Sequence, residues 1–270
     1  MANFNPEISA SKVAALIGLN PYQQPNEVMY DLLSKHLPTK IRMAKIESDE
    51  NRKALSKVKN DILYTQAVKD LVANGIQACV GKTDISGILE DVEKKASMII
   101  DLRHSELPEA VQELVAKEVR GAVQKKRGLN NENGILNTYE NENKVQVKDR
   151  NTVTFKKLYD GWRLIGRTDG YVEEHQRIVD SKARTRWWPQ VPLYDEIQMR
   201  VYMELSGAKE AELFEVFPDT RTRTTKYLND PAKWNTIHTQ LTEVVGYMQS
   251  ATVNDEDLLP IIFANTVVLK

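Results

Sequence analysis

Helical periodicity dominates the first half of the chain. Apolar residues recur every three or four positions over most of the first 140 residues, the spacing that places them on one face of a helix. Ser9 is expected to cap the first helix, Pro25 to begin the second, and Asn74-Gly75 to end the third. The predicted helices cover residues 9–18, 25–33, 41–73, 84–101 and 109–125.

The pattern changes near residue 145. β-branched and aromatic residues become frequent between 145 and 228, and the polar link 173–176 separates two apolar segments, which predicts an antiparallel hairpin. This order of elements favours an α+β fold. The predicted elements are strands at 161–172, 177–182, 212–217 and 222–228, a helix at 192–205, and a last helix opened by Asp230-Pro231.

Composition narrows the class of protein. No run of about 18 apolar residues occurs, and the N-terminal segment lacks the charged-then-apolar pattern of a signal peptide. We therefore expect an intracellular protein, not secreted and not in the membrane, located in the cytoplasm or, for a viral protein, in the host nucleus. The single cysteine, Cys79, excludes an internal disulfide and a cysteine-rich zinc or iron–sulfur site. The 4 histidines have no metal-ligand spacing.

The charge balance gives no general attraction to nucleic acid. The 37 basic and 38 acidic residues leave a formal net charge of −1, so any DNA contact must use local clusters of Lys and Arg. Each cluster fits a solvated surface equally well. Trp187 and Trp188 beside one cluster fit either a core-covering role or base stacking. The clusters are Lys117, Arg120, Lys125, Lys126 and Arg127; Lys182, Arg184 and Arg186; and Arg221, Arg223 and Lys226.

Acidic and basic side chains gather on the predicted hairpin. Asp169 stands in a Gly-Arg-Thr-Asp-Gly turn, and Asp180 and Lys182 lie two residues apart on the next strand. Side chains alternate across a strand, so Asp180 and Lys182 share a face, roughly 6 to 7 Å apart. Buried carboxylates this close repel one another unless a cation is present, and oxygen ligands alone favour Mg²⁺ or Mn²⁺. The pattern predicts a divalent-metal site.

This arrangement resembles the PD-(D/E)xK nuclease superfamily. In that superfamily an Asp at the end of one strand, and an acid two residues before a Lys on the next, hold the metals. Upstream, Gly128 and Glu132, followed by Tyr139, resemble the Gly-x-x-x-Glu helix that delivers a third carboxylate.

Two further segments are similar to one branch, which includes phage lambda exonuclease and the YqaJ-type viral recombinases. Residues 194–203 resemble its Gln-bearing helix, and residues 8–13 resemble its Ser-containing helix start. Together the likeness covers residues 8–22 and 127–217. Position 180 is Asp where the phage relative has Glu, and no Arg precedes the Ser-containing segment to hold a 5′-phosphate.

The resemblance implies one nuclease domain over residues 1–270, with a PD-(D/E)xK core at about 127–228 and a helical insertion at about 40–125. The implied core is a mixed central sheet flanked by helices. Glu132, Asp169, Asp180 and the Ser181 carbonyl would hold the metal. Lys182 would orient the attacking water or offset the growing negative charge, and Gln198 would position Lys182 or the water by hydrogen bonding. The residues expected to contact DNA are Ser11, Lys12, Arg127, Arg167, Arg184, Arg186 and Tyr202.

The implied activity is Mg²⁺-dependent hydrolysis at the ends of double-stranded DNA, 5′ to 3′, in recombination or replication repair. Because lambda-type relatives form ring-shaped trimers, the resemblance also implies a homo-oligomer, such as a trimer. It further implies a single-strand annealing or recombination protein as partner. Two alternatives stay open. One is a RecB/Cas4-like or endonucleolytic member of the same superfamily, and the other is a catalytically silent DNA-binding relative.

Overall fold

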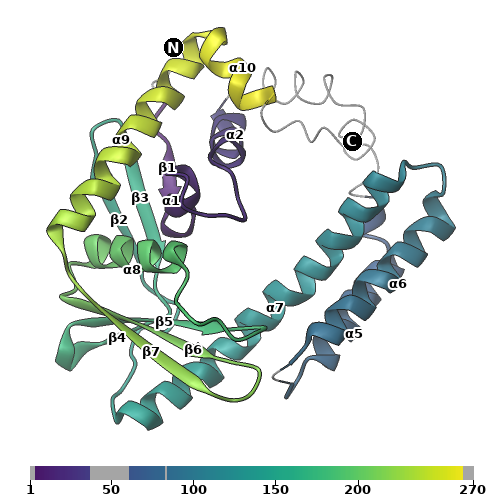
Figure 1. Cartoon of the computed structure of the whole chain (residues 1–270), viewed down its shortest axis with the longest axis horizontal. Coiled ribbons are helices and arrows are strands. Elements are labelled where there is room, and N and C mark those ends of the chain that lie inside the picture. Colours follow the sequence, from purple (N-terminus) through teal and green to yellow (C-terminus); the bar gives the residue numbers. More distant parts are fainter. Residues whose placement is uncertain (1–3, 37–60, 83, 264–270) are drawn as a thin grey trace.

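A computed structural model describes residues 4–36, 61–82 and 84–263 (Figure 1). Helices and strands both build the molecule, which confirms the predicted α+β class. None of the helices in these ranges combines the length and the apolar character needed to cross a bilayer. The elements are β1 (Glu7–Ser9), α1 (Ala10–Leu16), α2 (Pro25–His36), α5 (Gln66–Ala78), α6 (Ser86–His104), α7 (Glu109–Asn143), β2 (Thr154–Tyr159), β3 (Trp162–Arg167), β4 (Gly170–Val172), the 3₁₀ helix η1 (Glu173–His175), β5 (Arg177–Ala183), α8 (Leu193–Ser206), β6 (Glu210–Val216), β7 (Thr222–Leu228), α9 (Pro231–Val253) and α10 (Asp255–Phe263).

The strands form two mixed sheets. One has the order β1-β3-β2, with β1 parallel and β2 antiparallel to β3. The other has the order β4-β5-β6-β7, in which β5 and β6 are parallel and the outer pairs are antiparallel. The predicted hairpin is confirmed as β4 and β5, with Gly170 opposite Val179. The predicted strand 161–172 is instead interrupted at Thr168-Asp169, so β3 and β4 belong to different sheets.

Helices cover both faces of the four-stranded sheet (Figure 1). Ile178 of β5 belongs to the apolar cluster that includes α1, α8 and α9, whereas Val179 and Phe214 belong to a second cluster with the C-terminal half of α7. Because side chains alternate along a strand, Asp180 and Lys182 lie on the same face as Ile178. The candidate catalytic side chains of β5 therefore face α8.

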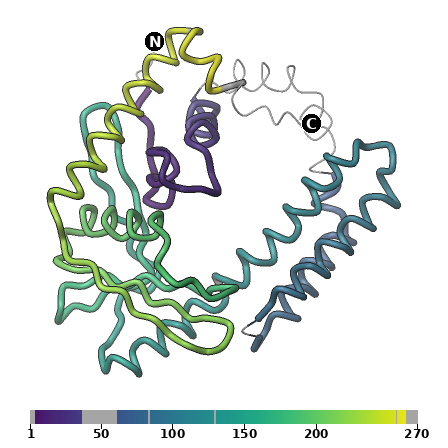
Figure 2. The backbone as a smooth tube through the Cα atoms, viewed as in Figure 1, coloured from purple at the N-terminus to yellow at the C-terminus, as the bar shows by residue number. Residues whose placement is uncertain are grey.

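α7 links this sheet to a bundle formed with α5 and α6 (Figure 2). The predicted end near residue 125 is wrong, because the helix runs from Glu109 to Asn143. The Asn-rich stretch after Gly128 lowers helix propensity. However, Ile135, Leu136 and Tyr139 continue the helical spacing and are buried beneath the sheet. Tertiary packing outweighs the local preference here.

Two other helix ends differ from expectation. The predicted end at Asn74-Gly75 is wrong, since α5 continues to Ala78. A Cβ at Gly75 would lie 2.9 Å from Val92 and 3.1 Å from Val123, so this glycine allows α5 to approach α6 and α7 closely. Ser9 stands at the N-cap of α1, but its side chain makes no capping hydrogen bond. The predicted helix over 41–73 falls, up to residue 60, outside the described residues.

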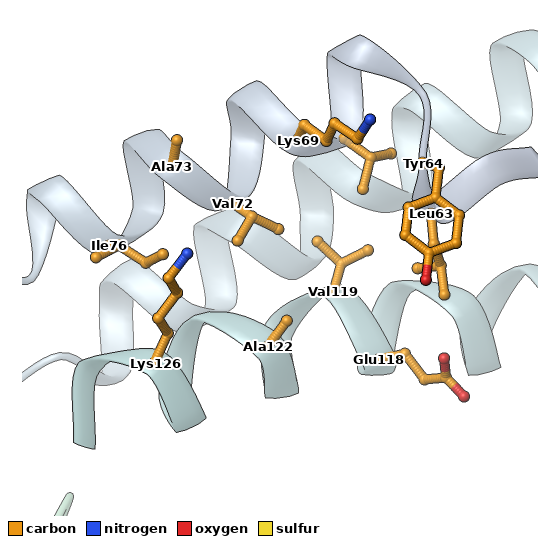
Figure 3. Close-up of a pocket in the computed structure, with 11 residues that line it drawn as sticks. Leu63, Tyr64, Lys69, Val72, Ala73, Ile76, Glu118, Val119, Ala122 and Lys126 are labelled. Carbon is orange, nitrogen blue, oxygen red and sulfur yellow. The ribbon is translucent and has the colours of Figure 1, made fainter. Parts of the chain in front are cut away.

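An apolar hollow of about 490 Å³ lies between α5 and α7. Figure 3 shows Val72 and Ile76 of α5 above Val119 and Ala122 of α7, with Lys126 at one end. No candidate catalytic residue lines the hollow. It therefore belongs to the bundle and not to the predicted metal site.

Gly170→Ala is expected to destabilise the protein by about 1 to 3 kcal/mol. A Cβ at this position would lie 2.1 Å from Cγ1 of the buried Val147, so the two side chains cannot keep their places. Urea unfolding measures the change. In the double variant with Val147→Ala, the total loss should be smaller than the sum of the two single losses. Strictly additive losses would contradict the steric explanation.

Candidate active site

Asp169 occupies the break between β3 and β4. Its Oδ2 accepts hydrogen bonds from the Ser181 backbone N–H at 2.7 Å and from the Ser181 hydroxyl at 2.9 Å. The Asp169 carbonyl accepts a hydrogen bond from the Asn151 N–H at 3.1 Å. These contacts fix the buried carboxylate beside the middle of β5. Ser181 thus anchors Asp169, a role that its predicted use as a carbonyl ligand did not include.

Asp180 and Lys182 lie next to each other on β5, as predicted from their spacing. Lys182 Nζ is 2.7 Å from Asp180 Oδ2, and Asp180 is only 1% exposed. Oδ2 thus contacts the Lys182 ammonium, and this contact opposes the effect of burial on the pKa of Asp180. Asp180 is therefore a buried carboxylate paired with one cation.

Burial raises the pKa of both acids. Burial and the hydrogen bond with Glu132 raise the pKa of Asp169 to about 7, although Lys182 opposes the shift. Burial and the charge of Asp169 raise the pKa of Asp180 to about 7, again against Lys182. Burial alone would lower the pKa of Lys182, but the charges of Asp180 and Asp169 raise it. The site thus holds more negative charge than one lysine neutralises.

Glu132 reaches the same place from α7. Its half-buried side chain lies within hydrogen-bonding reach of Asp169. The contact with Glu132 favours the protonated form of Asp169. The fold therefore places Glu132 beside Asp169, and Asp169 close enough to Asp180 to raise its pKa, although α7, the β3–β4 break and β5 are far apart along the chain.

Gln198 and Tyr202 border the site from α8. Gln198 Nε2 donates a hydrogen bond to the Tyr202 hydroxyl at 2.7 Å. Burial, followed by the charge of Asp180, raises the pKa of Tyr202, so the ring lies close to the acids. Tyr202 is buried and supports the site from within, which corrects its predicted exposure to DNA. The amide nitrogen of Gln198 is thus used by Tyr202, and the predicted role of Gln198 in positioning Lys182 or the water stays a prediction.

Two arginines predicted to contact DNA are internal. Arg127 is buried and donates to the Lys82 carbonyl at 3.2 Å. Arg184 contacts Asp195 and Glu215 at 2.7 Å each and is largely enclosed. A guanidinium must reach the surface to bind a phosphate, so these two residues are not retained as DNA contacts. Their burial could not be read from the clustering of basic residues alone.

The other predicted DNA contacts lie nearer the surface. Ser11, Arg167 and Arg186 are exposed, and the half-buried Lys12 donates through Nζ to Gln23 Oε1 at 3.0 Å. Their exposure is compatible with DNA contact, and their role stays a prediction.

Sequence reasoning missed two buried acids beside the site, Asp195 on α8 and Glu215 on β6. Asp195 pairs with Arg184 and lies close enough to raise the pKa of Lys182 and of Asp180. Glu215 stands in an apolar run of β6, and an acid in such a run is itself a signal of a buried ion pair. Asp195 follows Pro192 in the first turn of a helix, where acids commonly interact with the helix dipole. Its position in the sequence therefore does not indicate a buried ion pair.

The donor set fits a divalent cation. Carboxylate and carbonyl oxygens suit Mg²⁺ or Mn²⁺, and Asp169 and Asp180 are two buried carboxylates beside the single ammonium of Lys182. Within the described ranges, no three Asp, Glu, His or Cys side chains already converge as a complete metal site. Asp169 and Asp180 with the Ser181 carbonyl would hold the ion, and Glu132 would join them once its contact with Asp169 opens.

Comparisons with known proteins leave the family open. No protein-family model matches the chain, and no curated protein matches it in sequence. Among solved structures, a phage-related exonuclease from Haemophilus somnus gives a TM-score of 0.39 at 15% identity, over 48% of this chain and 72% of the other. An alkaline exonuclease from Laribacter hongkongensis gives 0.38 at 16% identity, over 58% of this chain and 87% of its own. Similarity this low does not assign the chain to a family.

Proposed function

We propose that this protein is a Mg²⁺-dependent exonuclease that hydrolyses phosphodiester bonds at the ends of double-stranded DNA in the 5′ to 3′ direction. The observation that carries the proposal is the buried cluster of Asp169 and Asp180, two carboxylates that share the single ammonium of Lys182. Burial raises the pKa of each acid to about 7, and a bound divalent cation would relieve the cost of ionising them.

Each residue of the site has a chemical role in this proposal. When bound, Mg²⁺ supplies positive charge to the scissile phosphate and lowers the pKa of a coordinated water. Lys182 stays protonated beside Asp180 and Asp169, so its ammonium can offset charge on the phosphate or orient the attacking water. Because Gln198 donates Nε2 to Tyr202, its carbonyl end is the one that can accept a hydrogen bond from Lys182 or the water.

Digestion of labelled duplexes tests the activity. We expect a linear duplex to be degraded with Mg²⁺ or Mn²⁺, to be bound but cut little with Ca²⁺, and to stay intact in EDTA. Labels at the 5′ or the 3′ end report the direction of degradation. A covalently closed circle of the same sequence is the matched control, and it should stay intact.

The same assay separates the alternatives. Cutting of the circle as fast as the linear duplex would contradict the exonuclease proposal and favour an endonucleolytic or RecB/Cas4-like enzyme. Cleavage that persists in EDTA would contradict the metal. Binding without cleavage in every metal would favour a catalytically silent DNA-binding relative.

A further inference from the structure

Arginine and tryptophan side chains gather where β5 and β6 end. These strands are parallel, with Ala183 opposite Val216, so the chain leaves both at the same edge of the sheet (Figure 1). The loop after β5 and the turn between β6 and β7 therefore lie side by side, joined by the hydrogen bond from the Arg184 N–H to the Val216 carbonyl at 2.9 Å. We name the side chains Arg186, Trp187, Trp188 and Arg221 at this edge the Arg–Trp patch.

The patch consists of two stacked cation–ring pairs. The Arg221 guanidinium carbon lies 4.0 Å from the centre of the Trp187 ring, and that of Arg186 lies 4.1 Å from the Trp188 ring. Trp187 also contacts Phe217, with ring centres 4.4 Å apart, yet it is 43% exposed. Arg221 forms an ion pair with Asp219, and Arg186 is exposed. Arg221 and Phe217 thus each cover part of Trp187, and the part of the indole that stays exposed lies next to positive charge.

Buried ion pairs hold the patch in place. Arg223 donates through Nε to Glu215 at 2.6 Å and through a terminal nitrogen to the carbonyls of Trp188 at 2.8 Å and Pro189 at 3.2 Å. Arg184, at the start of the loop, contacts the other oxygen of Glu215. The backbone that carries the indoles is therefore fixed before any ligand arrives, which lowers the entropic cost of binding.

We propose that the Arg–Trp patch binds unpaired nucleotides of the DNA substrate or product, with a base stacked on Trp187 in place of the Arg221 guanidinium, and with phosphates contacted by Arg186 and the displaced Arg221. This inference rests on the proposed nuclease function. Aromatic rings beside Arg are the usual platform for single strands, because every base has a face that can stack on them. Four residues of chain span at most about 14 Å, so Arg186 lies within a few nucleotides of Lys182.

Binding of a fluorescein-labelled 12-nucleotide oligothymidine in EDTA tests the patch without requiring cleavage. By anisotropy, we expect Trp187→Ala to weaken binding by about 5- to 150-fold, the range measured for loss of one stacking partner. Trp187→Phe should lose less, because it keeps an aromatic ring. Arg186→Ala/Arg221→Ala should flatten the slope of log K against log salt by up to about 1.4 for a single strand. The matched control Lys94→Ala/Arg103→Ala removes two exposed charges from α6 and should change neither value.

The outcomes distinguish the patch from the proposed function. Trp187→Ala that melts like the wild type and binds the oligonucleotide equally well would overturn the patch, whatever the cleavage assay shows. An equal loss of affinity for a blunt duplex and for the single strand would overturn base stacking as its role. If Trp187→Ala does not fold, unchanged binding by Trp187→Phe together with an unchanged salt slope in the double arginine variant overturns the patch. If the wild type binds the oligonucleotide but shows no Mg²⁺-dependent cleavage, the proposed nuclease function is contradicted and the result on the patch still holds.

Discussion

Asp180→Asn is expected to slow DNA cleavage by at least about 10² to 10⁴-fold and, in the same variant, to raise the melting temperature of the metal-free protein at pH 8. Both effects come from the charge of the Asp180 carboxylate, which would bind the metal ion and which is unfavourable in the folded protein when no metal is bound. Asp180 is 1% exposed, and burial raises its pKa to about 7. Ionising it inside the folded protein costs free energy that an uncharged side chain of the same shape avoids.

The direction of the pKa shift fixes the pH dependence. An unfolded aspartate titrates near 3.9, so between about pH 4 and pH 7 the folded protein binds the Asp180 proton more tightly than the unfolded chain does. The resulting stabilisation is complete below about pH 4 and is lost as the pH rises through about 7. Asp169 has the same direction of shift, and because the two acids interact, their effects do not add.

Calorimetric melting in EDTA at pH 5 and pH 8, with and without Mg²⁺, measures these effects. The wild type should gain stability from Mg²⁺ at pH 8, and Asp180→Asn should gain much less. Asp219→Asn, in the exposed turn between β6 and β7, is the control and should bring no gain at pH 8. If Asp180→Asn melts below the wild type at pH 8 in EDTA, Asp180 acts mainly as a structural partner of Lys182.

Local rules account for the part of the site that sequence predicted. Asp180 and Lys182 are two residues apart on one strand, and the period of a strand places them together in any fold that keeps the strand. The prediction that Glu132 belongs to the site depended on the resemblance, because its helix meets Asp169 only through tertiary packing. The turn at Asp169 was predicted, but its division of the segment between two sheets was not, and this break directs Asp169 toward Ser181.

Long-range pairing explains the predictions that were wrong. Arg184 and Arg127 belong to basic clusters that suggest a DNA-binding surface, but whether an arginine meets solvent depends on elements distant in sequence. Asp195 on α8 and Glu215 on β6 enclose Arg184, and the Lys82 carbonyl receives Arg127. The end of α7 was missed for a similar reason, since the sheet that buries its second half follows it in the chain.

Glu215→Ala is expected to destabilise the protein by about 3 to 5 kcal/mol, because it leaves a buried charge without its partner. Glu215 is 0% exposed, and its two oxygens contact Arg184 at 2.7 Å and Arg223 at 2.6 Å. Arg184 keeps its ion pair with Asp195 in the variant, whereas Arg223 keeps only hydrogen bonds to backbone carbonyls. The unpaired charge is therefore that of Arg223.

Urea unfolding of a second variant tests this reasoning. Glu215→Met/Arg223→Met removes one charge of each sign and leaves the pair of Arg184 and Asp195 balanced, so it should recover most of the stability lost in Glu215→Ala. Asp219→Ala breaks the exposed ion pair with Arg221 on the neighbouring turn and should change the unfolding midpoint little. A double variant less stable than Glu215→Ala would show that Arg223 is held by the carbonyls of Trp188 and Pro189 rather than by charge. In that case the loop of the Arg–Trp patch would depend on hydrogen bonds alone.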